Sequence, residues 1–224
     1  MLIDAGNNDD GKDVVEFVKD KGITKLNYLV GTHPHEDHIG GLDDVINSDI
    51  VIENIFMPKI QTNTKTFEDV LDAVSNKGLK VTAPKKGDTF KIGDANCEVM
   101  TDSILDEKNL NLSSIVIRLE FGNNSFLFTG DAETKNEATR DWSTVDVLKI
   151  GHHGSNTSSS QSFLEQVKPK ISIIMAGKDN SYGLPKEKIL NRLKSIGTKI
   201  YRTDEQGTIT ITSDGNNIKV DTEK

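Results

Sequence analysis

The sequence predicts a mixed α/β fold in which two layers of β-sheet are covered by helices. Apolar residues at helical spacing alternate with short apolar strands in both halves of the 224-residue chain, and the stretch from Leu79 to Phe128 is rich in short strands. The sequence contains no repeat, low-complexity tract or proline-rich linker. We therefore expect a single domain over residues 1–224.

The elements of the first half follow from apolar periodicity and from the glycines that end it. Residues 1–6 have the pattern of a strand end that runs into a polar loop, and the recurrence of valine and phenylalanine over residues 11–21 predicts a helix that Gly22 ends. A helix built around Phe67 and Val74 is closed by Gly78. The remaining predicted elements are a strand at Leu26–Val30, a helix at Leu42–Asn47 and a strand at Val51–Met57.

The second half begins with short alternating strands, and the turn Gly122-Asn123-Asn124 predicts a hairpin. Helices and strands alternate again after Asp131, where a helix is expected first. The predicted strands are Phe90–Ile92, Cys97–Thr101, Ser114–Phe121, Ser125–Phe128, Val145–Ile150, Ile171–Ala176, Lys199–Arg202, Thr208–Ile211 and Ile218–Val220. The predicted helices are Gln161–Val167 and Lys186–Ile196.

Composition narrows the classes of function. The chain has 27 Lys and Arg against 35 Asp and Glu, a net charge of −8 and a pI of about 5.2. The excess of acidic residues argues against broad nucleic-acid binding without a metal ion, because the affinity for phosphates comes mainly from clustered Lys and Arg. Binding of a phosphodiester at a metal site is still compatible with this charge. The longest apolar runs, such as Ile171–Ala176, are far shorter than a membrane span, so we expect no membrane insertion by this chain. The chain has a single cysteine, Cys97, which excludes an internal disulfide and favours a cytoplasmic location. A secreted domain, or a domain derived from a membrane protein, is the alternative.

All five histidines lie in two short segments, Gly31–Gly41 and Gly151–Ser155. The first segment follows a predicted strand and offers four donors in the order His33, His35, Asp37, His38. Imidazole and carboxylate donors suit zinc, manganese or iron, and loops at the carboxyl ends of strands are where α/β folds place ligands. The alternative is a turn of solvated histidines in which Asp37 caps the following helix.

These motifs resemble those of the metallo-β-lactamase superfamily, and more narrowly the metallo-β-lactamase-like domain of the competence protein ComEC family. The resemblance runs through nearly the whole chain in order. It rests on Leu2–Gly6, Thr32–Gly41, Ser114–Leu119, Phe128–Glu133, Val147–Ser155, Asn180–Pro185 and Tyr201–Asp204. It implies a four-layer αββα sandwich that holds one or two divalent metal ions, Zn²⁺ or Mn²⁺.

The resemblance also implies how the donors divide between the two ions. His33 and His35 would face the first ion, Asp37 and His38 the second, and Asp131 would bridge them. An alternative for Asp131 is a turn or helix cap, because Gly-Asp before a helix is common.

The adjacent imidazoles of the second segment would have different roles. His153 would complete the second ion, whereas strand-like alternation would turn His152 away from it and toward substrate. Asp37 and His152 are accordingly the residues expected to take part in catalysis. The alternative for His152 is a packed or solvated imidazole.

Three departures from the resembled pattern stand out. No histidine lies between His38 and His152 to complete the first ion, and Asn111 and Ser114 are candidate substrate groups in that region, or only a loop end and a strand start. Leu184 stands where relatives often have a histidine, which removes a ligand or proton donor. Relatives usually also have one or two strands before the first one here. Either the sheet lacks these strands or it is completed differently, and a missing edge would invite strand-mediated self-association.

Together these features predict a hydrolase that uses metal-activated water, acting on a phosphodiester in an anionic small molecule or a nucleic acid. Ser155 begins a Ser/Thr-rich run leading into a helix, which is able to take a phosphate or to form only a polar loop with a cap. One alternative function is hydrolysis of a lactone, thioester or β-lactam. Another is a catalytically weakened metal-binding regulatory or interaction module.

Overall fold

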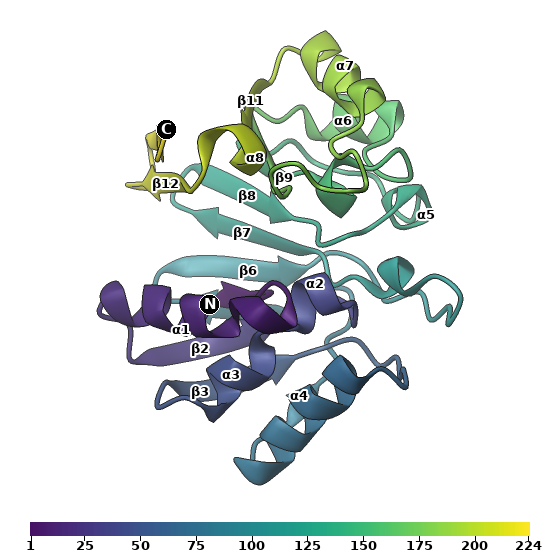
Figure 1. The fold of residues 1–224 in the computed structure, drawn as a ribbon. Helices are drawn as coiled ribbons and strands as arrows, with labels where there is room; N and C mark the ends of the chain where they lie inside the picture. The colour runs from purple at the N-terminus through teal and green to yellow at the C-terminus, as the bar shows by residue number, and fades with distance from the viewer. The chain divides into compact units, whose positions relative to one another are not determined.

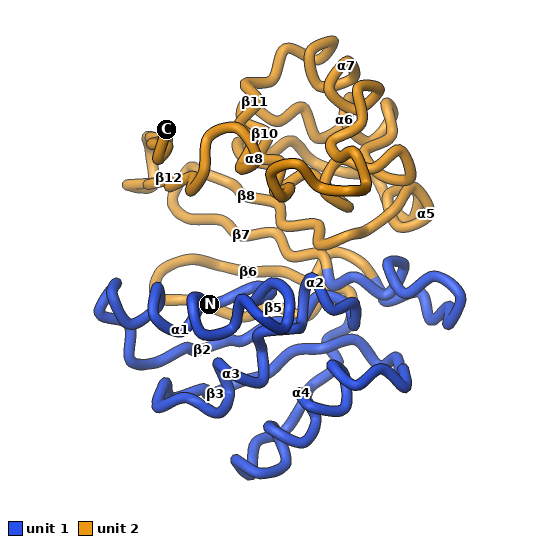
Figure 2. The backbone as a smooth tube through the Cα atoms, viewed as in Figure 1, with its two compact units in different colours: residues 1–85, 102–115 blue, residues 86–101, 116–224 orange.

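A computed structural model describes residues 1–224 of the chain, and the elements follow the predicted order (Figure 1). The chain forms two compact units (Figure 2). Unit 1 consists of residues 1–85 and 102–115, and unit 2 of residues 86–101 and 116–224. None of the helices has the length and apolar character needed to cross a membrane.

Unit 1 contains a parallel four-stranded sheet in the order β1-β2-β3-β4. Its strands are β1 (Leu2–Ile3), β2 (Lys25–Val30), β3 (Val51–Phe56) and β4 (Val81–Thr82). Helical segments connect the strands: η1 (Asn8–Asp10), α1 (Gly11–Asp20), α2 (Glu36–Ile39), α3 (Leu42–Asn47) and α4 (Lys65–Asn76). Because parallel strands all end on the same side of the sheet, the loops after β1 and β2 are neighbours.

The core of unit 1 forms between the sheet and its helices. Leu29 and Ile55 of the strands are buried against Leu42, Ile46 and Val70 of α3 and α4. In α4 the cap is Thr64, whose hydroxyl accepts a hydrogen bond from the Phe67 N–H. Apolar burial on one face therefore fixes these helices on the sheet.

Unit 2 contains a seven-stranded sheet in the order β11-β10-β9-β8-β7-β6-β5. Strands β5 to β8 are antiparallel and strands β8 to β11 parallel. The strands are β5 (Thr89–Ile92), β6 (Ala95–Val99), β7 (Ile117–Phe121), β8 (Asn124–Phe128), β9 (Val147–Lys149), β10 (Ile171–Ile174) and β11 (Lys199–Arg202).

The two faces of the parallel part of this sheet are covered differently. Leu148 and Ile174 pack with helices α6 (Gln161–Val167) and α7 (Glu187–Ser195). Val147 and Ile173, one residue earlier on each strand, pack against the separate hairpin of β12 (Ile209–Ser213) and β13 (Ile218–Thr222). The alternation of neighbouring residues between faces is the two-residue period of a strand. The short helices α5 (Thr134–Glu137) and α8 (Thr203–Gln206) complete the unit.

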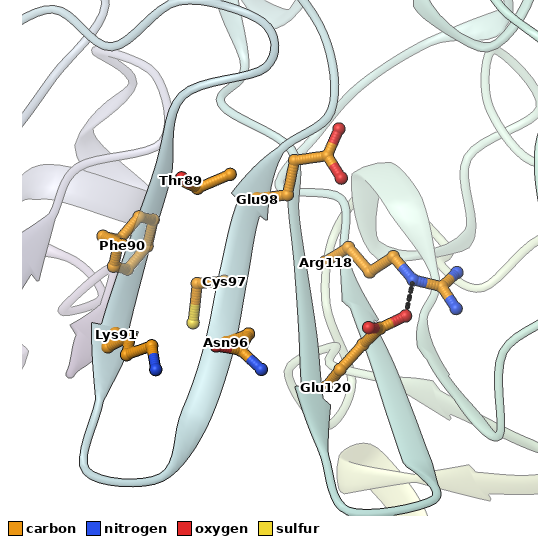
Figure 3. A pocket seen from close by; sticks show the side chains of 8 residues that line it. All are labelled: Thr89, Phe90, Lys91, Asn96, Cys97, Glu98, Arg118 and Glu120. Carbon is orange, nitrogen blue, oxygen red and sulfur yellow. Dashed lines mark hydrogen bonds and ion pairs between the residues drawn. The ribbon is translucent and has the colours of Figure 1, made fainter.

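A polar groove of about 460 Å³ lies along β5, β6 and β7 (Figure 3). Its charges are matched, because Lys91 and Arg118 are accompanied by Glu98 and Glu120, and Arg118 Nε donates to Glu120 Oε1 over 2.9 Å. None of the predicted site residues lines it. The buried Cys97 lies in its wall, and burial raises the pKa of this thiol to about 11.

The structure differs from the prediction at several strand ends and in one helix that was not predicted. The strand expected from Ser114 begins at Ile117, because the segment before it forms the 3₁₀ turn η2 (Leu110–Ser113). The strand expected to reach Ile150 ends at Lys149, where the chain enters the glycine-flanked turn η3 (Gly151–Gly154). Helix α8 was not predicted, since its four polar residues carry no apolar periodicity.

Candidate functional site

The first histidine cluster lies in unit 1, in the loop that follows β2. His35 is the N-cap residue of α2, and Asp37 lies inside the first turn of that helix. The alternative in which Asp37 caps the helix is therefore wrong. Gly40 comes so close to the backbone of Asn7 and Asn8 that a Cβ would lie 2.3 Å from either residue. Only glycine allows the loop and the segment after β1 to pack this tightly.

The structure gathers the four predicted donors of this loop. His33 Nε2 and His35 Nδ1 are 3.0 Å apart, and the rings of His33 and His38 have centroids separated by 4.2 Å. His38 Nε2 lies 3.7 Å from Asp37 Oδ2. His33 and His38 are buried, whereas Asp37 is about half exposed. The cluster thus combines buried imidazoles with a carboxylate that solvent reaches.

Asp4 orients this cluster, and sequence reasoning had not assigned it a role. Its carboxylate accepts hydrogen bonds from the Thr32 N–H over 2.7 Å and from the Thr32 hydroxyl over 2.9 Å. His38 Nδ1 lies 2.7 Å from Asp4 Oδ2. Because a carboxylate only accepts, His38 carries its proton on Nδ1 and, when neutral, its lone pair on Nε2.

The electrostatics of Asp4 agree with this geometry. Burial alone would raise the pKa of Asp4, but His38 and the Thr32 N–H hold that pKa below its ordinary value. Asp4 also has a left-handed backbone, with φ at 60°. The sequence could have indicated this role for Asp4, because Asp4 follows the short strand β1 just as the histidine loop follows β2, and ligands bind at the carboxyl ends of parallel strands.

Asn111 and Ser114, the candidate substrate residues of unit 1, are both buried. Asn111 belongs to η2, and Ser114 follows that turn. The next residue, Ile115, donates its N–H to the Thr32 carbonyl over 2.9 Å. This bond holds the segment beside the start of the histidine loop, and a contact of either side chain with substrate stays a prediction.

Asp131 lies in unit 2, three residues after the end of β8, and is buried. The N-cap of the following helix α5 is Glu133, so the alternative in which Asp131 caps that helix is wrong. His153 Nε2 lies 3.4 Å from Asp131 Oδ2, and His152 Nε2 lies 3.8 Å from the same oxygen. The structure therefore brings Asp131, His152 and His153 together, as the predicted metal and catalytic residues of this unit.

The predicted strand-like alternation of His152 and His153 was wrong. Both residues have left-handed backbones, with φ values of 49° and 51°, inside the turn η3. Such angles are uncommon for residues other than glycine and cost about 1–2 kcal/mol each. They direct both imidazoles toward Asp131 instead of to opposite sides, although His153 is the nearer of the two.

Each imidazole of this pair has a partner for Nδ1. His153 Nδ1 donates to the Met175 carbonyl over 2.7 Å, at the end of β10. His152 Nδ1 lies 2.8 Å from the Thr157 hydroxyl and 3.5 Å from a carboxylate oxygen of Glu133. Because a carbonyl only accepts, Nδ1 of His153 is protonated and Nε2 carries the lone pair.

The Ser/Thr-rich run after this turn serves as a helix cap. The N–H groups of Ser159 and Ser160 donate to the carboxylate of the buried Glu137, and the Ser160 hydroxyl accepts from the Phe163 N–H. The N–H groups that are able to bind a phosphate at this helix therefore bind the Glu137 carboxylate of the protein itself. Ser155 lies at the other end of the run, where its hydroxyl is 3.3 Å from that of Thr157.

Comparison with known proteins places this arrangement in a family. Residues 1–178 match the model of the metallo-beta-lactamase superfamily. The chain belongs to this superfamily, whose fold agrees with the predicted α/β class. His33, Asp37 and His38 of unit 1, and Asp131 and His153 of unit 2, are its candidate metal-binding residues.

Two curated relatives are more than 30% identical to this chain, and the name of one of them describes a competence protein. The chain is 35% identical over 202 residues to ComE operon protein 3 of Bacillus subtilis, covering 88% of this chain and 26% of the relative. It is 39% identical over 215 residues to competence protein ComA of Neisseria gonorrhoeae, with the same two coverages of 88% and 26%. The chain thus spans about a quarter of the length of these relatives.

A solved structure supports the fold alone. The metallo-beta-lactamase fold protein YhfI from Bacillus subtilis superposes with a TM-score of 0.55 at 10% identity, covering 89% of this chain and 82% of that chain.

Proposed function

We propose that this chain is a metal-dependent hydrolase that cleaves a phosphodiester with metal-activated water. In this proposal the histidine loop of unit 1 and the Asp131, His152 and His153 group of unit 2 contribute to one centre for one or two Zn²⁺ or Mn²⁺ ions. Membership of the superfamily and the relation to competence proteins support it. The natural substrate would be an anionic small molecule or a nucleic acid.

The orientation of the imidazoles is the observation that carries the proposal. His38 and His153 both bind an acceptor through Nδ1, and both place Nε2 within 3.4–3.7 Å of a carboxylate oxygen. Two ligands that each lie about 2.1 Å from a tetrahedral zinc ion are about 3.4 Å apart. An Nδ1 hydrogen bond that fixes tautomer and ring orientation is the usual support of a metal-binding histidine. The donor set therefore fits a divalent ion.

The charges of the chain agree with a role for metal ions. The protein has a net charge of −8. Two of its carboxylates, Asp37 and Asp131, are candidate metal ligands. When bound, divalent ions reverse this local charge, supply a water of lowered pKa as the nucleophile, and polarise a phosphoryl oxygen. The two carboxylates would hold the ions in place.

His152 is the residue of this chain suited to handle a proton. Its Nδ1 contacts the Thr157 hydroxyl and lies near Glu133, so the ring is held from one side while Nε2 lies 3.8 Å from Asp131. In this proposal His152 holds a proton for the departing oxygen of the substrate. Asp37, half exposed beside His38, is the carboxylate of unit 1 nearest to solvent and substrate.

Hydrolysis of bis-p-nitrophenyl phosphate by the metal-loaded protein tests the proposal, with Asp131→Asn as the variant. We expect the variant to lose at least about 100-fold in kcat/KM, because a ligand and a buried negative charge are removed. The exposed Asp141 in the same unit provides the matched control, and Asp141→Asn should retain the activity. Circular dichroism of all three proteins shows whether the fold is intact.

The same assay separates the alternative functions. Turnover of nitrocefin, a lactone or a thioester without turnover of the phosphodiester would show that the enzyme hydrolyses that other class of substrate. Binding of metal without turnover of any of these substrates would identify a regulatory or interaction module. Absence of metal binding would overturn the proposal as a whole.

A further inference from the structure

Tyr182 is the most exposed of the large apolar side chains of this protein. It is 77% exposed, compared with 59% for Leu105 and 58% for Val51. Met175, whose carbonyl binds His153, is also 48% exposed. The ring of Tyr182 therefore presents a large aromatic face to solvent, and such a face is able to stack on a flat apolar group of a ligand.

The loop that carries Tyr182 is internally braced. The Asn180 amide group donates to the carbonyls of Gly177 and Leu184 over 2.9 and 2.7 Å, and its oxygen accepts from the Leu184 N–H over 2.9 Å. Gly183 donates its N–H to the Asn180 carbonyl over 3.1 Å. Tyr182 therefore stands on a loop whose shape is fixed before any ligand arrives, which lowers the entropy cost of binding.

This loop is seated on the turn that holds His152 and His153, within the same unit. Lys186 donates its N–H to the Gly154 carbonyl over 2.9 Å and its ammonium group to the Tyr182 carbonyl over 2.6 Å. A Cβ on Gly154 would lie 2.6 Å from the Pro185 Cβ, so the loop and the turn are in close contact. The loop that carries Tyr182 thus packs against the turn that holds the candidate metal-binding residue His153.

The charge of this region suits an anionic partner. Although the whole chain is acidic, the stretch from Lys168 to Arg202 contains nine Lys and Arg and two Asp and Glu. Lys178 and Lys188, on either side of the Tyr182 loop, are exposed. An exposed aromatic ring among cations is the combination by which proteins bind single-stranded nucleic acid, the cations neutralising phosphates and the ring stacking on a base.

We propose that Tyr182 is a stacking platform for an unpaired base of a single-stranded nucleic acid whose adjacent phosphodiester enters the metal centre. The proposal rests on the proposed function, since the phosphodiester is the group to be cleaved. It identifies Tyr182 as a specificity-determining residue. A base in a duplex is already stacked on both sides, so the platform favours single strands over duplexes.

The test compares two oligomers of equal length, an oligothymidylate and a chain of abasic tetrahydrofuran nucleotides. Both carry the same phosphodiesters, and only the first carries bases. We expect Tyr182→Ala to raise the KM for oligothymidylate about tenfold with kcat little changed, and to leave the KM for the abasic oligomer unchanged. Tyr182→Phe keeps the ring and should behave like the natural protein. Phe17→Ala removes another exposed aromatic residue, 54% exposed on α1, and should have no effect.

A second readout does not depend on catalysis. In Tyr182→Trp, oligothymidylate should quench the fluorescence of the new indole and the abasic oligomer should not, while the buried Trp142 provides a constant background. Equal KM changes for both oligomers, or no selective quenching, would overturn the stacking role. Failure of the natural protein to hydrolyse bis-p-nitrophenyl phosphate would overturn the proposed hydrolase instead, and the quenching experiment would still decide whether Tyr182 stacks on a base.

Discussion

The two histidine clusters of this protein are built in different ways. In unit 1 four donors lie within six residues, and a partly buried carboxylate, Asp4, holds His38. In unit 2 the candidate ligands come from two separate segments, around Asp131 and His153, and the neutral carbonyl of Met175 holds His153. A charged acceptor binds more strongly than a neutral one, whereas the second cluster depends on unusual backbone angles for its shape.

An imidazole can therefore be oriented either by a charged hydrogen-bond partner or by the backbone geometry of a turn. Asp4 ties His38 to the end of β1, so the first cluster depends on a hydrogen bond from an imidazole to a carboxylate. His152 and His153 are aimed by a turn between Gly151 and Gly154, so the second cluster depends on the chain path. Substitutions should therefore damage the two clusters by different routes.

The largest effect is expected at Gly40, where the first cluster needs close backbone contact. Gly40→Ala would place a Cβ 2.3 Å from the backbone of Asn7 and Asn8, and we expect it to lower the free energy of unfolding by about 3 kcal/mol. Gly22→Ala is the control, because Gly22 has a φ of +71° but nothing within 4 Å of the added Cβ, so its cost should be about 1 kcal/mol. Urea titration measures both, and equal losses would contradict the role of the contact.

A smaller effect is expected from the partners of the imidazoles. Asp4→Asn should weaken metal binding about 10- to 100-fold, because the amide removes the charge that orients His38. Thr157→Val should weaken it about threefold or less, because Glu133 remains 3.5 Å from the same nitrogen of His152. Metal titration calorimetry measures both constants. A larger loss for Thr157→Val than for Asp4→Asn would reverse the comparison of the clusters.

The smallest effect concerns Asp146, a carboxylate of unit 2 with a structural role. Burial would raise its pKa, but hydrogen bonds from Lys170 and Ser125 hold the pKa below its ordinary value of 3.8. The ionised form is thus favoured in the folded state, so its stabilisation is present above that ordinary value and is lost as the pH falls through the lower folded value. We expect Asp146→Asn to cost about 1 kcal/mol at neutral pH and to differ least from the natural protein in acid. Thermal unfolding over a pH series measures this, and a constant difference at every pH would contradict it.

The order of the elements was predictable from the sequence because apolar periodicity reports burial on one face. The helix α1 and the strand β2 lie within a residue or two of their predicted positions. The start of β7 was not predictable, since Ser114 to Val116 look like a strand but follow the turn η2. The spacing of apolar residues does not reveal a short turn such as η2, whose hydrogen bonds join residues of the same short segment.

The candidate site was predictable where its donors lie close together in the sequence. The cluster from His33 to His38 could be recognised from spacing alone, but its partner Asp4 lies 34 residues before His38. The left-handed angles of His152 and His153 were not predicted, because a positive φ is uncommon for any residue other than glycine. Glu137 could not be assigned to the N-terminus of α6, since that contact joins residues 22 and 23 positions apart.

The proposed function requires that ligands from both histidine clusters bind the metal ions. Anomalous diffraction at the absorption edge of zinc, from crystals of zinc-loaded protein, decides whether they do. We expect one or two peaks within about 2.3 Å of donor atoms from both groups, His33 or His38 in one group and Asp131 or His153 in the other. Peaks bound by one group alone, or no peak at these residues, would overturn the proposed metal centre.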